Sequence, residues 1–244
     1  MVGKYAKDWP VMARYTAVYS DFVSRLGEVE LLRRKAAALE RSPRSLLHGP
    51  EISALCRASV VLLSSHIEAY IKELGEHTLD TAHRMLVHRS RIAPQFFYYV
   101  TREQIENIRD SSQPEVIAKH VQALVDTEIL HWQGSGPIHG PISSTNFNAG
   151  FSNPKFEKIK AYFGRFGYVD FRRDFMRTLT VRGNAVETSL NAIVDTRNAI
   201  AHGDPSATKT PREVKEMQST AKEFCRTVDD VFSKWCRSSL CKIR

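Results

Sequence analysis

Apolar residues recur at helical spacing through most of this chain. One long amphipathic pattern runs from about Val11 to Leu39, and a second runs from about Pro50 to Glu76. The second pattern advances in steps of three and four residues, as one face of an α-helix requires. Its apolar positions are Val60, Leu63, Ile67, Tyr70, Ile71 and Leu74. These patterns predict two long helices in the first eighty residues.

Helical patterns continue towards the C-terminus. Shorter ones cover residues 102–109 and 114–130, and a last helix opens at Thr210-Pro211-Arg212-Glu213. That opening places a threonine at the N-cap, a proline at the first helical position and a glutamate at the third, which is the spacing of a capping box. The only strand signal is a weak one over Arg177–Val181. The fold class predicted is all-α.

A helix over residues 184–202 carries the most informative run of the chain. Asn184 and Glu187 have the spacing of a second capping box, and Gly203 is placed to end the helix in a left-handed turn. At about 100° per residue, its apolar positions fall between about −40° and +80° of one face, and Arg197 falls at about +20°. The apolar positions are Val186, Leu190, Ile193, Val194, Ile200 and Ala201. Arg197 is therefore predicted inside the apolar stripe.

The organisation is that of one domain over residues 1–244. It comprises N-terminal helices over 11–76, an insert over 77–153 and a core over 154–236 that carries the Arg197 helix. The last helix is expected to pack antiparallel to that helix across a short turn. Residues 133–153 are rich in Gly, Pro, Ser and Asn and predict a long loop, which we interpret as a flap over the site.

Charge and aromatic residues concentrate in one segment of a chain with net charge +8. Between Lys155 and Arg182, eight basic residues face three acids, and seven aromatic residues lie among them. Basic residues among aromatics suit single-stranded nucleic acid, although aromatic residues at this spacing are more often core. We expect the aromatics to be core, and Arg172, Arg173 and Arg177 to bind RNA.

Composition bounds the cellular context. The first residues lack the apolar core of a signal peptide, and the best apolar run, Val60–Leu63, is too short to span a bilayer. We expect a cytoplasmic protein with no membrane partner. The four cysteines form no Cys-x-x-Cys pair, which predicts free thiols, with Cys225 in the core, and no metal site.

Arg197 and His202 together could act on a phosphodiester. The guanidinium is a fork of donors that matches phosphate oxygens, and imidazole can accept and donate a proton near neutral pH. Each residue also has a structural interpretation, because a lone arginine can pair with a buried acid and a histidine is favoured near a helix C-terminus. Asn198 lies one turn before His202 on the same face, and small residues nearby leave the helix end accessible.

The run Arg197-Asn198-Ala199-Ile200-Ala201-His202-Gly203 resembles the signature of the HEPN superfamily. The segments 64–74, 150–154 and 163–167 are similar to its RiboL-PSP-associated subgroup. The resemblance implies an all-helical bundle with additional helices. It also implies a metal-independent endoribonuclease of toxin–antitoxin or anti-phage defence systems that needs no cofactor. It further implies an active homodimer, and side chains five residues apart on a helix do point about 140° away from each other.

The expected roles follow from these observations. Arg197 and His202 are the predicted catalytic residues, Asn198 and Glu68 the supporting ones, and Ser64 a weaker choice. If Glu68 points inward from its helix, its carboxylate is the first candidate to orient Arg197. The expected partners are RNA, a second copy of the chain, and an antitoxin or regulatory protein. The alternative is a non-catalytic helical module that binds RNA or a partner.

Overall fold

A computed structural model describes residues 14–132, 135–138 and 141–244 of the chain. Within these residues the secondary structure consists of α-helices and short 3-10 turns, with one isolated bridge between His88 and Pro137 in place of any strand. The predicted all-α fold is confirmed.

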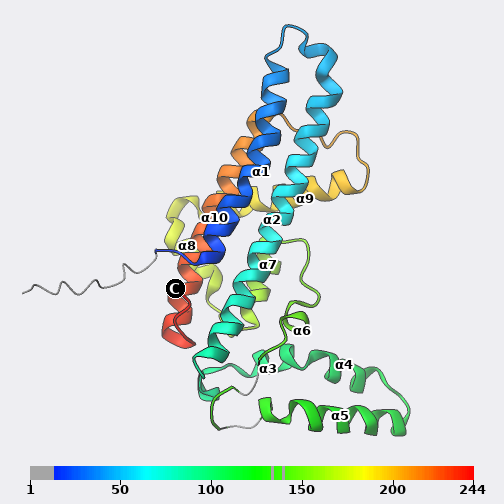
Figure 1. Cartoon of the computed structure of the whole chain (residues 1–244), viewed down its shortest axis with the longest axis vertical. Coiled ribbons are helices and arrows are strands. Elements are labelled where there is room, and N and C mark those ends of the chain that lie inside the picture. Colours follow the sequence, from blue (N-terminus) through cyan, green and yellow to red (C-terminus); the bar gives the residue numbers. More distant parts are fainter. Residues whose placement is uncertain (1–13, 133–134, 139–140) are drawn as a thin grey trace, which may run out of the picture.

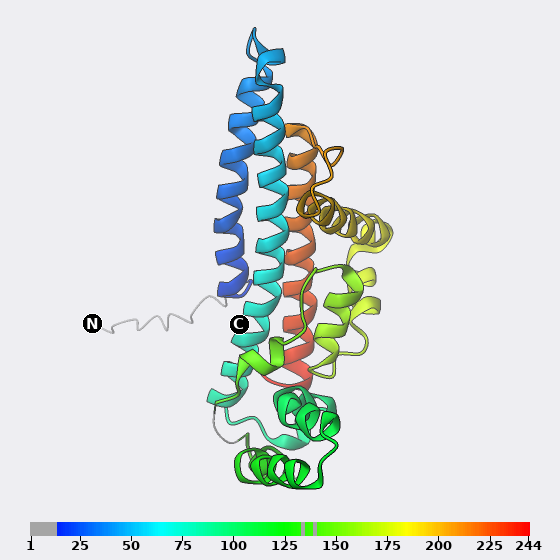
Figure 2. The ribbon, with the colours of Figure 1, turned by 90° about the vertical axis from the view of Figure 1, so that its right-hand side faces the viewer.

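Three long helices lie side by side along the long axis of the molecule (Figures 1 and 2). They are α1 (Ala17–Glu40), α2 (Gly49–Arg84) and α10 (Pro211–Ser239). The α2 helix has the length and apolar content of a membrane span, but its apolar face packs against α1, α9 and α10. Val60, Leu63, Ile67 and Tyr70 on that face are fully buried, as expected of a core helix. The helix also continues two turns beyond the predicted end at Glu76.

The α9 helix (Gly183–Ala201) crosses α2 and α10, and Figure 2 shows it nearly end-on at the side of the bundle. Its C-terminal end carries Arg197 and His202. Gly203 has φ +79°, its N–H donates to the carbonyl of Ile200, and the N–H of Asp204 donates to that of Ala199. These two bonds form a Schellman motif, so the predicted left-handed end is confirmed.

The start of α9 differs from the prediction. The chain leaves α8 (Phe171–Leu179), makes a 3-10 turn over Thr180–Arg182 and enters α9 without a side-chain cap. Glu187 does not close a capping box with Asn184, because its carboxylate binds Arg172 of α8 at 2.8 Å. The weak strand prediction over Arg177–Val181 is also wrong, since α8 continues to Leu179 and the 3-10 turn over Thr180–Arg182 follows it directly.

The capping box predicted for the last helix is present. The Thr210 hydroxyl accepts from the N–H of Glu213, and the Glu213 carboxylate accepts from the N–H of Thr210. A turn over residues 202–210 joins α9 to α10, and the two helices are in contact.

Five shorter helices complete the described chain. They are α3 (Pro94–Val100), α4 (Arg102–Asp110), α5 (Pro114–Trp132), α6 (Ser144–Asn148) and α7 (Phe156–Gly164). The α4 and α5 helices form a hairpin at the lower end of the molecule in Figure 1. Both helices were predicted with nearly these bounds.

The described residues of the segment 133–153, which are 135–138 and 141–153, do not form a free flap over the site. Residues 141–153 contain α6 and bury Ile142, Phe147 and Phe151, and Ile138 before them is buried too. Residues 133–134 and 139–140 of the predicted loop lie outside the described residues. In the described residues of this segment, an apolar side chain every few residues packs into the core.

The aromatic residues of segment 155–182 are core, as predicted. All seven are at most 2% exposed: Phe156, Tyr162, Phe163, Phe166, Tyr168, Phe171 and Phe175. Cys225 is also in the core, and all four cysteines are buried free thiols. Burial raises the pKa of the Cys225 thiol well above its ordinary value.

Candidate anion-binding site at the C-terminal end of α9

Arg197 is half-buried and is held by two neutral amide groups. Its Nη1 donates to Oδ1 of Asn153 at 3.1 Å and to Oδ1 of Asn198 at 3.0 Å. No carboxylate of the described residues forms an ion pair with it, so the expected alternative of a buried acid partner is not found there. Amide oxygens orient a guanidinium without neutralising its charge. The other guanidinium nitrogens remain available to an anion.

Asn153 connects Arg197 to the neighbouring helix α2. Its backbone N–H donates to Oε2 of Glu68 at 3.3 Å while its side chain accepts from Arg197. Its φ of +54° lies in the left-handed region, which asparagine tolerates better than most residues. Glu68 does point inward, and its other oxygen accepts from Lys72 Nζ at 2.7 Å. The predicted direct pairing of Glu68 with Arg197 is therefore wrong, because Asn153 lies between them.

The residues after Asn153 run along the surface of α9. Lys155 forms an ion pair with Asp195 at 2.5 Å, and the N–H of Phe156 donates to Oδ1 of Asn191 at 3.0 Å. Together with the Asn153 contact, these bonds fix the loop to three positions of the helix, Asn191, Asp195 and Arg197. The two acids of this network, Glu68 and Asp195, each pair with a lysine. The positive charge of Arg197 is therefore not compensated within the network.

His202 occupies the C-cap position of α9 and is exposed. No hydrogen bond to its ring occurs in the part of the chain that the structure describes. The turn that follows is fixed from α2, because Arg57 Nη1 donates to the carbonyl oxygen of Asp204 at 3.0 Å. The backbone at His202 is thus well supported, while its imidazole is open to solvent or to another molecule.

The remaining predicted residues are dispersed. Ser64 is buried in α2, one turn before Glu68. Arg172 lies over the ring of Phe156 and pairs with Glu187, on the α9 side of α8. Arg173 and Arg177 pair with Asp170 and Asp174 and line a separate pocket. The three arginines expected to bind RNA therefore do not form one patch with Arg197.

Two residues of this site could not be predicted as its members. Asn153 lies in the segment 150–154, whose one signal is its resemblance to the RiboL-PSP-associated subgroup, and Arg57 carries no local signal at all. Asn153 and Arg197 are 44 residues apart, and Arg57 and Asp204 are 147 apart. Both contacts depend on how α7, α9 and α2 pack, which no local pattern specifies.

The arrangement can bind an anion at Arg197, and it places an exposed imidazole at the same end of the helix. Phosphate oxygens match the guanidinium fork, and the exposed ring can exchange a proton with a bound group. No cluster of three or more metal-ligating side chains occurs in the residues that the structure describes. Fold and site together define an all-helical protein with a supported arginine and an exposed histidine at one helix end.

The family model of RiboL-PSP-HEPN matches residues 21–234, which include both of these residues. The chain belongs to this family, and the expected relation to the HEPN superfamily is confirmed. No curated protein and no solved structure matches the chain. Family membership is consistent with a function connected to RNA.

Proposed function

We propose that this protein is a metal-independent endoribonuclease of a toxin–antitoxin or anti-phage defence system that acts in the cytoplasm. The observation that carries the proposal is the environment of Arg197. The guanidinium is half-buried, oriented by two neutral oxygens and not paired with an acid among the described residues. An oriented cation of this kind is suited to the extra negative charge of a phosphodiester transition state.

The reaction uses the 2'-hydroxyl of the RNA as the nucleophile. Arg197 binds the scissile phosphate and stabilises its developing charge. His202 transfers a proton, either from the 2'-hydroxyl or to the leaving 5'-oxygen. The products carry a 2',3'-cyclic phosphate and a 5'-hydroxyl. No cofactor takes part in this scheme.

Asn198, Asn153 and Glu68 support the reaction through Arg197. Asn198 and Asn153 hold Nη1, and Glu68 holds the backbone of Asn153. Ser64, buried in α2 one turn before Glu68, has the weaker support of position alone. Arg172 is a candidate RNA contact beside α9, where it would exchange its ion pair for a phosphate.

The active species is proposed to be a homodimer with the ends of two α9 helices lining one cleft. His202 is exposed while Arg197 is half covered by Asn153, and side chains five residues apart on a helix point about 140° away from each other. A two-fold axis at the helix ends would bring an imidazole of one chain towards a guanidinium of the other. An antitoxin or regulatory protein would act by covering the same ends.

The direct test is RNA cleavage with EDTA in excess. The wild-type protein should cleave, and Arg197→Ala and His202→Ala should each lose at least about 100-fold in rate, the scale for losing an oriented donor. Arg212→Ala is the matched control, because Arg212 is an 88% exposed helical arginine paired with Glu216. Full activity in either site variant with normal thermal melting would refute the site.

Two other outcomes have clear meanings. Loss of activity in EDTA that magnesium restores would replace the proposal with a metal-dependent mechanism. RNA binding without cleavage in the wild-type protein would favour the non-catalytic module. Induced expression in bacteria tests the defence role, since growth arrest should follow with the wild-type gene and disappear with His202→Ala.

A further inference from the structure

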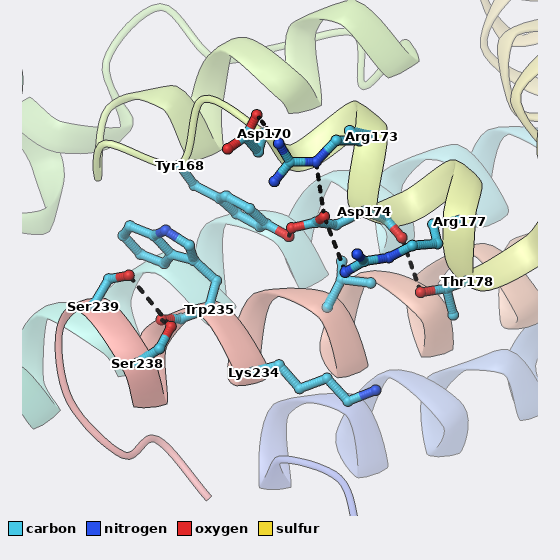
Figure 3. Close-up of a pocket in the computed structure, with 11 residues that line it drawn as sticks. Tyr168, Asp170, Arg173, Asp174, Arg177, Thr178, Lys234, Trp235, Ser238 and Ser239 are labelled. Carbon is cyan, nitrogen blue, oxygen red and sulfur yellow. Dashed lines mark hydrogen bonds and ion pairs between the residues drawn. The ribbon is translucent and has the colours of Figure 1, made fainter.

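A pocket of about 680 Å³ lies between α8 and the C-terminal part of α10, as Figure 3 shows. One wall comes from Asp170 and α8, and the other from α10. Tyr168 lies at their junction. The lining residues are Tyr168, Asp170, Arg173, Asp174, Arg177, Thr178, Val231, Lys234, Trp235, Ser238 and Ser239. Its volume is within the range of sites for small molecules.

One end of the pocket is aromatic and rigid. The Trp235 ring lies nearly parallel to that of Tyr168, with 5.0 Å between centroids and 13° between planes. The Tyr168 hydroxyl donates to Oδ2 of Asp174 at 3.0 Å, which fixes this ring in place. Trp235 is half-buried, so part of the indole is accessible from the pocket. A fixed aromatic surface of this kind can contact the π-face of a base.

The other end is cationic. Arg173 and Arg177 extend from α8 (Figure 3), and Lys234 of α10 also lines the pocket, with its Nζ 2.6 Å from Oδ2 of Asp230. Nη2 of Arg177 lies 3.3 Å from Oδ1 of Asp174, and the Arg177 side chain is 78% exposed. Exposed ion pairs of this kind contribute little stability, so a phosphate can replace the carboxylate at small cost. Asp170 and Oδ1 of Asp174 can then accept from amino groups of a base, while Oδ2 of Asp174 keeps its bond from Tyr168.

We propose that this pocket binds one nucleotide unit, with the base against Trp235 and the phosphate on Arg173, Arg177 and Lys234. An apolar ligand does not suit the five charged side chains, and a bare phosphate would leave the aromatic end unused. The nucleotide can be free or part of a single-stranded RNA. The chemistry recognised is the same in both cases.

The pocket is distinct from the Arg197 site. It adjoins α8, which leads into the N-terminal end of α9, whereas Arg197 and His202 lie towards the other end. A helix of 19 residues is about 28 Å long. Binding here therefore does not require the catalytic scheme proposed above, and the two can be tested separately.

The experiment follows Trp235 fluorescence in a protein whose two other tryptophans, Trp9 and Trp132, are replaced by phenylalanine. Each nucleoside monophosphate, inorganic phosphate and a non-cleavable single-stranded pentanucleotide are titrated in turn. We expect saturable quenching by a monophosphate or the pentanucleotide. Arg177→Ala should weaken it about tenfold, as for loss of one charge-assisted hydrogen bond. Arg212→Ala, with the same charge change at an exposed helical site, should leave it unchanged.

The outcomes distinguish RNA from a free nucleotide as the ligand, and they show which result would overturn the proposal. Quenching by the pentanucleotide that depends on Arg177 assigns the pocket to RNA, and quenching by monophosphates alone assigns it to a free nucleotide. Equal affinity for inorganic phosphate would overturn the base contact. No saturable signal up to millimolar concentrations, or equal weakening by Arg212→Ala, would overturn the pocket. Arg197→Ala should bind normally, so a failure of the proposed nuclease activity would not affect this result.

Discussion

Arg197 is held by amide oxygens, whereas the arginines of α8 pair with carboxylates. The helical count placed Arg197 within the apolar stripe of α9, and its half-buried position agrees with that count. The helical count does not predict which groups surround the Arg197 guanidinium. Asn153 reaches Arg197 because a loop crosses the helix, so its role depends on tertiary packing.

The neutral character of Asn153 can be tested with two substitutions. Asn153→Asp places a carboxylate on Arg197, which should compete with phosphate and lower kcat/KM for RNA by about tenfold or more. Asn153→Gly keeps the left-handed backbone and the N–H that binds Glu68, so it should lose less. The measurement is RNA cleavage by both variants beside their melting temperatures. Equal losses would show that charge at this position is unimportant.

A second residue-scale feature is the buried carboxyl of Asp229 in α10. It accepts from the backbone N–H of Thr16 at 3.1 Å and from the Thr16 hydroxyl, and the Tyr70 hydroxyl lies 3.5 Å away. These contacts fasten the start of α1 to α10. Burial raises its pKa above the ordinary value of 3.8, against the opposing effect of the hydrogen bonds from Thr16. The folded chain therefore holds this proton more tightly than the unfolded chain does.

This shift gives a pH dependence of known sign. Between pH 3.8 and the raised pKa the folded state binds more protons, so the contribution of Asp229 to stability falls as pH rises. Asp229→Asn does not titrate. The free energy of unfolding of this variant minus that of the wild type should therefore increase with pH from about 4 upwards. Urea unfolding of both proteins at several pH values measures the difference. A decrease with pH would mean that the carboxylate is favoured in the fold.

At the scale of elements, helix ends were predictable where the capping residues are close in sequence and no residue from another helix competes for them. The Thr210–Glu213 box and the Gly203 turn are completed within six residues, and both are present. Asn184 and Glu187 carry the same kind of signal, but Arg172 from another helix takes the carboxylate. The α2 helix extends beyond its predicted end at Glu76 because Leu79 and Ala82 continue the buried face. A local pattern thus predicts the end of a helix correctly unless a residue distant in sequence binds one of the capping groups.

The contact between α2 and α7 depends on one glycine. A Cβ on Gly75 would lie 1.9 Å from the Tyr162 hydroxyl, which donates to Oδ1 of Asn148 at 2.6 Å. Gly75→Ala should therefore destabilise the protein by about 1–3 kcal/mol through overpacking, despite the better helix propensity of alanine. Gly27→Ala in α1 is the control, since nothing lies within 4 Å of its Cβ position. It should stabilise by about 0.5–1 kcal/mol. Chemical denaturation measures both, and equal effects would contradict the close approach.

At the scale of the whole molecule, the helical class was predictable and the placing of the insert was not. Arg165 illustrates the reason. It is buried, donates to the carbonyl oxygens of Phe147 and Ala149, and lies 4.6 Å from the centre of the Tyr99 ring. Such contacts join α3, α6 and α7, and the contact between Tyr99 and Arg165 spans more than sixty residues of chain. The sequence marks Arg165 only as one cation in a basic segment.

The placing of α9 across the bundle bears on the proposed dimer. Its C-terminal end extends beyond α2 in Figure 1, so His202 and the small residues before it are open to a second copy. Within one chain, Asn153 covers part of Arg197, and side chains five residues apart on a helix point about 140° away from each other. A cleft between two such ends would supply both groups to one phosphate and would exclude water from the reacting atoms.

Mixing two inactive variants tests whether each site takes its arginine and histidine from different chains. Arg197→Ala supplies an intact His202, and His202→Ala supplies an intact Arg197. If the pair acts across the two-fold axis, a mixed dimer contains one complete site. Random exchange should then restore about a quarter of wild-type cleavage, because half of the dimers are mixed and each has one of two sites. Cleavage is assayed on size-exclusion fractions whose mass is measured by light scattering. A wild-type monomer peak that cleaves RNA, or a dimer that stays inactive after exchange, would refute the shared site, and the monomer result would leave the catalytic pair itself intact.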